Sequence, residues 1–121
     1  MALLGTSEES MNSLDIDLPL NIGTFNCRGL QKSRKLHSLF NTFKKQKLDI
    51  ISLQETHMGT EEDILQIKNR WNGPFHYSGG TSQSGGLITL FNPNVFSAAD
   101  INLIYVTDNI LISSLRINKN M

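Results

Sequence analysis

Two short apolar runs separated by a helical pattern open the interpretable part of the chain. Residues 20–25 and 48–53 are predicted to be strands, and the second run lacks clean alternation, as expected for a strand covered on both faces. Between them a helix is predicted to begin at a Ser33 N-cap. Its apolar residues recur at spacings of three and four, as on one helical face: Leu36, Leu39, Phe40 and Phe43. The order strand, helix, strand predicts a right-handed parallel crossover.

A second helix is predicted after Thr60, which is a suitable N-cap. Acidic residues 61–63 fill the first turn, where the helix dipole favours negative charge, and residues 72–74, Asn-Gly-Pro, end the helix. The apolar stripe of this helix contains Trp71. A core position for Trp71 is favoured over the alternative, a stacking platform for a nucleobase.

Beyond residue 74 the pattern changes to short extended runs separated by turns, which predicts antiparallel pairing. The extended runs are residues 75–78, 87–91, 95–105 and 110–117, and a Gly/Ser-rich connection spans residues 79–86. The predicted fold class is therefore α/β (α+β), a βαβα unit followed by a β-meander.

Length and composition fit one small domain, since the chain has 121 residues of which 39% are hydrophobic. Residues 1–18 are expected to be a polar, disordered leader and residues 19–121 the domain. Cys27 is the only cysteine, which excludes a disulfide within the chain and fits a reducing compartment. No signal peptide or membrane span is visible, so an intracellular protein that is not secreted is expected.

The formal net charge is zero, so no global field favours nucleic acid. The basic residues are nevertheless concentrated between positions 28 and 47, without an acidic residue among them. Lys44, Lys45 and Lys47 suit the C-terminal end of the first helix, where the dipole favours cations. For the others, a solvated surface and a contact with a phosphate backbone are equally good interpretations: Arg28, Lys32, Arg34 and Lys35.

Asn26 and Glu55 directly follow the two predicted parallel strands. The carboxyl ends of such strands lie at one sheet edge, where ligands bind in open α/β sheets. A carboxylate beside a carboxamide suits a hard cation such as Mg²⁺. The alternatives are a turn residue for Asn26 and an exposed carboxylate near a helix N-terminus for Glu55. The histidines, at positions 37, 57 and 76, are predicted at the surface, and none has a zinc-ligand spacing with another.

Three stretches resemble the endonuclease/exonuclease/phosphatase family, which has the DNase I-like fold. Residues 22–30 read Ile-Gly-Thr-Phe-Asn-Cys-Arg-Gly-Leu, with the family's Asn-x-x-Gly turn, and residues 48–57 read Leu-Asp-Ile-Ile-Ser-Leu-Gln-Glu-Thr-His, with its Leu-Gln-Glu segment. Residues 84–90 resemble its strand after a glycine-rich loop. Within the family, the chain is most similar to retrotransposon apurinic-type endonucleases and exonuclease III.

The resemblance implies half of a four-layer αββα sandwich and a nuclease that hydrolyses DNA with Mg²⁺, or Mn²⁺. Glu55 would be a catalytic residue that binds the metal directly. Asn26, also catalytic, would lie beside it and contact the metal shell or the scissile phosphate. A retroelement origin would imply a nuclear location. The sequence contains one Asp-x-Asn string, at residues 100–102, but the family's late Asp-His pair is absent from it. We therefore interpret the chain as the N-terminal part of such a domain, inactive alone, whose exposed apolar sheet face is covered by the missing half or another chain.

Two alternatives remain at this point. One is a non-catalytic nucleic-acid-binding or interaction module that uses the basic residues 28–47. The other is a phosphomonoesterase or phospholipase branch of the same superfamily, which the sequence hardly distinguishes from a nuclease.

Overall fold

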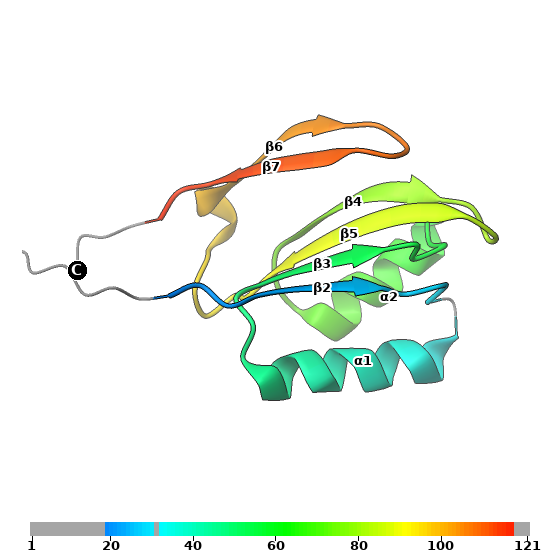
Figure 1. Ribbon diagram of the computed structural model, residues 1–121, viewed down its shortest axis with the longest axis horizontal. Helices are drawn as coiled ribbons and strands as arrows, with labels where there is room; N and C mark the ends of the chain where they lie inside the picture. Colours follow the sequence, from blue (N-terminus) through cyan, green and yellow to red (C-terminus); the bar gives the residue numbers. More distant parts are fainter. Residues whose placement is uncertain (1–18, 31, 118–121) are drawn as a thin grey trace, which may run out of the picture.

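The computed structural model describes residues 19–30 and 32–117, so the predicted leader, residues 1–18, lies outside the described residues. The helices and strands alternate as predicted at first and end in a run of strands (Figure 1). In chain order they are β2 (Ile22–Asn26), α1 (Ser33–Gln46), β3 (Ile50–Gln54), α2 (Glu61–Trp71), β4 (Phe75–Gly80), β5 (Gly85–Phe91), the 3-10 helix η1 (Ala98–Asp100), β6 (Ile101–Val106) and β7 (Leu111–Leu115).

Four strands form the main sheet in the order β2-β3-β5-β4. The pair β2 and β3 is parallel, and β5 runs antiparallel to both of its neighbours. Both helices lie on the same side of this sheet in Figure 1. The predicted parallel crossover and the α/β fold class are confirmed. The ends of β2 and β3 consequently lie at one edge, as the sequence pattern required.

The predicted β-meander is wrong in one respect. Strands β6 and β7 pair with each other in a separate two-stranded sheet, and β5 does not pair with β6. Figure 1 shows this second sheet on the side of the main sheet opposite the helices. The chain turns there because Phe91, Phe96 and Ile101 form a small buried cluster of their own. Burial of these side chains moves β6 out of the main sheet and into a second layer.

The two helices bury the stripes that their spacing predicts. Leu36, Phe40 and Phe43 of α1 are buried in the main core. Helix α1 begins at Ser33 with Lys32 at the N-cap and no side-chain cap, so the predicted Ser33 cap is wrong. Helix α2 has the predicted Thr60 cap, in which the Thr60 hydroxyl accepts from the backbone N–H of Asp63 in a capping box.

Trp71 occupies a core position. Its side chain is only 6% exposed, and its ring meets that of Phe40 edge-on, with 5.9 Å between centroids. The indole Nε1–H is shared between the carbonyls of Phe91, at 3.0 Å, and Pro74, at 3.2 Å. Trp71 therefore ties the end of α2 to the end of β5, and the nucleobase-stacking alternative is wrong.

The side of the main sheet that the helices leave uncovered carries polar side chains toward the ends of β2 and β3. Ile51 and Leu53 are fully buried in the core, so the alternation of β3 turns Ser52 and Gln54 to the opposite face. Thr24 of β2 pairs in register with Ser52 and shares that face. Ile22, at the start of β2, lies on the same face and is 63% exposed, so this face is mixed rather than uniformly apolar. Further half-exposed apolar side chains occur on the second sheet, at Leu103, Ile104, Tyr105, Val106 and Ile112.

His76 lies between the two sheets. Its Nδ1 is 2.7 Å from the hydroxyl of Ser113 in β7, and its ring meets the edge of Phe91. Beside it, the Ser78 hydroxyl donates to the carbonyl of Thr107. His76 is half-buried, because the second sheet covers that part of β4, so its predicted surface position is only partly correct.

Candidate active site

The structure brings Asn26 and Glu55 together at the ends of β2 and β3. Asn26 is the last residue of β2 and pairs in register with Gln54, the last residue of β3. The side-chain Nδ2 of Asn26 donates to Oε2 of Glu55 over 3.2 Å. Both residues are exposed. A carboxylate and a carboxamide thus meet at an accessible sheet edge.

The backbone conformation of Glu55 explains how its side chain reaches Asn26. In a continued strand, Glu55 would point to the face opposite Gln54 and Asn26. Glu55 instead has a φ of 51°, in the left-handed region that non-glycine residues seldom occupy. Its carbonyl accepts from the N–H of Gly29 at 2.8 Å, which fixes the kinked residue against the turn after β2. Strained backbone of this kind is concentrated at functional sites.

The turn after β2 is held by polar contacts from two directions. Oδ1 of Asn26 accepts from the backbone N–H of Arg28 at 3.3 Å, so Asn26 is a turn residue as well as a partner of Glu55. From α1, Nζ of Lys35 donates to the carbonyl of Cys27 at 2.6 Å. Cys27 itself is buried, and burial raises the pKa of its thiol to about 11. The thiol therefore stays neutral and serves packing.

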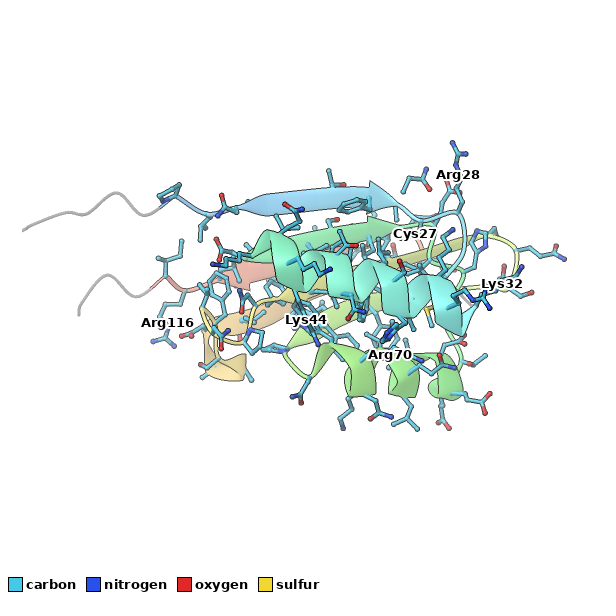
Figure 2. All side chains as sticks on the ribbon, turned by 90° about the horizontal axis from the view of Figure 1, so that it is seen from below. Cys27, Arg28, Lys32, Lys44, Arg70 and Arg116 are labelled. Atoms are coloured by element: carbon cyan, nitrogen blue, oxygen red, sulfur yellow. The ribbon has the colours of Figure 1, made fainter. Side chains whose placement is uncertain are left out.

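The four predicted nucleic-acid contacts lie in the turn after β2, at Arg28, and at the start of α1, at Lys32, Arg34 and Lys35. Figure 2 shows Arg28 and Lys32 at the same end of the molecule, whereas Lys44 lies further along α1. Lys32, Arg34 and Lys35 line an open groove of about 430 Å³ along α1, together with Ser38, Leu39 and Thr42. The ammonium group of Lys35 is engaged at the Cys27 carbonyl. Arg28 and Lys32 thus share one end of the molecule, and Arg28 is hydrogen-bonded to Asn26 through its backbone N–H.

The histidines at positions 57 and 37 differ in their distance from the site. His57 is only partly exposed and lies against the turn after β2: a β-carbon on Gly29 would be 2.9 Å from its Nδ1. It therefore lies close to the site, although the sequence pattern predicted a surface loop. His37 of α1 is exposed as predicted, and its Nδ1 is 3.2 Å from Nη1 of Arg70 in α2.

The donor set suits an oxygen-ligated cation in part. The Glu55 carboxylate is an exposed anionic ligand, and carboxylate oxygens are what Mg²⁺ prefers. Asn26 presents its nitrogen to Glu55, so it orients the carboxylate in the way that outer hydrogen-bond partners orient metal ligands. Within residues 19–30 and 32–117 there is no cluster of three or more His, Cys, Asp or Glu that could hold a metal. The described part of the chain thus offers one candidate metal ligand, Glu55, and the residue that orients it, Asn26.

Comparison with known proteins places these residues inside a recognised family pattern. A family model described as the endonuclease/exonuclease/phosphatase family matches residues 23–114, a stretch that contains both Asn26 and Glu55. No curated protein matches the sequence. In the described part of the chain, neither helix is long and apolar enough to cross a membrane.

Proposed function

The chain belongs to the endonuclease/exonuclease/phosphatase family, and we propose that it forms part of a Mg²⁺-dependent phosphodiesterase that acts on DNA. The observation that carries the proposal is the hydrogen bond between Asn26 and Glu55 at the end of two parallel strands. The stretches around these residues also motivate a retroelement-type endonuclease, which would work in the nucleus. Mn²⁺ is the expected substitute for Mg²⁺.

The two residues at this sheet edge bind the cation and orient its ligand. Glu55 binds the cation, and Asn26 holds the carboxylate in place through Nδ2. When bound, the cation would neutralise charge on the scissile phosphate. Arg28 and Lys32, at the same end of the molecule, contact neighbouring phosphates of the DNA backbone.

A second polypeptide segment is part of the proposal, either further sequence of the same protein or another chain. Two features of the described residues support it. Strand β2 has only one paired neighbour in the main sheet, so one of its edges is available for another strand. The second sheet exposes a row of apolar side chains, with Ile104 61% exposed, that another layer would bury. That segment would bring the general base and a phosphate-binding histidine.

The cation site is tested by adding Mg²⁺ to the 121-residue chain and recording ¹H–¹⁵N NMR spectra. We expect the side-chain amide of Asn26 and the backbone amide of Glu55 to shift. The variant Glu55→Gln keeps the shape but removes the charge, so these shifts should disappear. Glu62→Gln, on the exposed first turn of α2, is the matched control and should respond like the unchanged chain. Unchanged Asn26 and Glu55 resonances in the folded protein would refute the site.

Turnover is tested by nicking of supercoiled plasmid with Mg²⁺. We expect the 121-residue chain to show no nicking above background, since the proposed general base lies in the second segment. Robust nicking that Glu55→Ala abolishes would show that the described residues suffice, and would contradict this part of the proposal.

A second candidate function is non-catalytic DNA binding, which the shared position of Arg28 and Lys32 favours. Binding should then weaken as salt increases, with a shallower salt dependence in an Arg28→Ala/Lys32→Ala variant. A Lys44→Ala/Lys45→Ala variant removes equal charge from the last turn of α1 and is the control. Binding that survives Glu55→Ala but falls in the first double variant would favour this function over catalysis. Equal losses in both double variants would indicate nonspecific charge attraction.

A further inference from the structure

The carboxamide of Gln54 crosslinks the two strands that carry the site. Its Nε2 donates to the hydroxyl of Thr24 in β2 at 2.9 Å. The same nitrogen lies 3.0 Å from the hydroxyl and 3.1 Å from the carbonyl oxygen of Ser52 in β3. A carbonyl oxygen only accepts, so the nitrogen end of the amide must face Ser52, and the orientation of the side chain is fixed by chemistry.

The position of this crosslink relates it to Asn26 and Glu55. Gln54 is in register with Asn26 across the strand pair and directly precedes Glu55. It lies on the face of the sheet that α1 and α2 leave uncovered. Strand β2 is held by β3 alone within the described main sheet. A small shift of β2 along or away from β3 would therefore lengthen the 3.2 Å bond between Asn26 and Glu55 beyond useful range.

From this arrangement we infer that Gln54 is a positioning residue for the pair of Asn26 and Glu55. Its amide fixes the end of β2 against the end of β3, and thereby holds the Glu55 carboxylate where Asn26 can orient it. Ordering a glutamine side chain costs conformational entropy, which its hydrogen bonds to Thr24 and Ser52 offset. The part of the inference that concerns cation affinity rests on the proposed function. The part that concerns the geometry of Asn26 does not.

The experiment breaks the crosslink at either end in the full 121-residue chain. Thr24→Val is nearly isosteric and removes the acceptor on β2, and Gln54→Leu removes the donor. We expect both to shift or broaden the Asn26 side-chain amide resonance in metal-free protein. Both should also weaken the affinity for Mg²⁺ about tenfold, because a displaced Asn26 would no longer orient Glu55, and losing such an outer hydrogen-bond partner of a ligand usually has an effect of this size.

Two matched variants separate this role from a general effect on the sheet. Thr24→Ser keeps the hydroxyl and should behave like the unchanged chain. Ser52→Ala removes one acceptor but leaves the bond from Gln54 to Thr24, so its Asn26 resonance should stay in place. Thr24 is exposed, so Thr24→Val is expected to fold, and the backbone resonances of α2 report whether each variant has done so.

The outcomes are distinguishable. A wild-type Asn26 resonance in both folded Thr24→Val and folded Gln54→Leu would overturn the positioning role, even if Mg²⁺ binds. A chain that shows no response to Mg²⁺ would overturn the proposed cation site, and the metal-free Asn26 resonance would still decide the role of Gln54. Equal changes in Thr24→Ser and Thr24→Val would also overturn the inference, because the hydroxyl would then not matter.

Discussion

Gly86 of β5 lies against the buried hydroxyl of Thr56, the residue that follows Glu55. A β-carbon on Gly86 would collide with Oγ1 of Thr56 and lie 3.1 Å from the backbone nitrogen of His57. Gly86 also has a φ of 94°, which side chains with a β-carbon seldom adopt. Its carbonyl accepts from the N–H of Thr56 at 3.1 Å. The glycine thus allows β5 to approach and hold the segment that carries Glu55.

The substitution Gly86→Ala should lower the free energy of unfolding by about 2–4 kcal/mol, since the left-handed backbone and the collision with Thr56 both oppose it. Urea denaturation measures this loss. Gly79→Ala is the control, because its β-carbon would meet its nearest neighbour at an ordinary 3.8 Å. It should change stability by no more than about 0.5 kcal/mol. Equal losses in the two variants would mean that close approach at Gly86 is unimportant.

Cys27 should be almost inert toward alkylation in the folded protein. Burial raises the pKa of its thiol from 9.0 to about 11, although the nearby Lys35 partly opposes the shift. Because the thiolate is the reactive form, reaction with iodoacetamide near pH 8 should be about a hundredfold slower than in the urea-unfolded chain. Cys27 is the only cysteine, so modified protein can be counted by mass. A native rate within a few fold of the unfolded rate would indicate an accessible, ionisable thiol.

Trp71 should stabilise the folded protein through hydrogen bonding as well as through packing. Trp71→Phe keeps an aromatic ring against Phe40 but removes the donor shared by the Phe91 and Pro74 carbonyls. We expect a loss of about 1–3 kcal/mol in the free energy of unfolding, because the Phe91 carbonyl loses the indole N–H, whereas the Pro74 carbonyl keeps the backbone N–H of Phe91. Tyr77→Phe, at a side chain 41% exposed, is the control and should have little effect. A loss no larger than that of the control would contradict the hydrogen-bonding role.

The meeting of Asn26 and Glu55 at one sheet edge was predictable because it depends only on the pattern of apolar residues along the chain. The apolar runs and the amphipathic helix between them required parallel strands, and parallel strands bring Asn26 and Glu55 to the same edge. The helix stripes through Phe40 and Trp71 were predictable for the same reason. Helical and strand periodicity report which face is buried, and burial dominates the energetics of these elements.

The remaining features depend on contacts that no local pattern encodes. Strand alternation would have turned Glu55 away from Asn26, and only its left-handed backbone, fixed by Gly29, brings the carboxylate back. The second sheet depends on Phe96 and Ile101 meeting Phe91, which is a tertiary contact. Gln54 is part of the motif that carries the family resemblance, but its bond to Thr24 requires the register of β2 and β3 to be known.

His76 should make the stability of the protein depend on pH. Burial between the sheets lowers its pKa below the ordinary 6.5, so the unfolded chain takes up a proton at a higher pH than the folded one. The contribution of neutral His76 to stability is thus complete above about pH 6.5 and is lost as the pH falls through the folded pKa. Melting temperatures measured over this range should fall with decreasing pH. His76→Asn keeps a polar partner for Ser113 but does not titrate, so its melting temperature should fall less steeply. An unchanged slope in this variant would assign the pH dependence to other groups and remove His76 as its source.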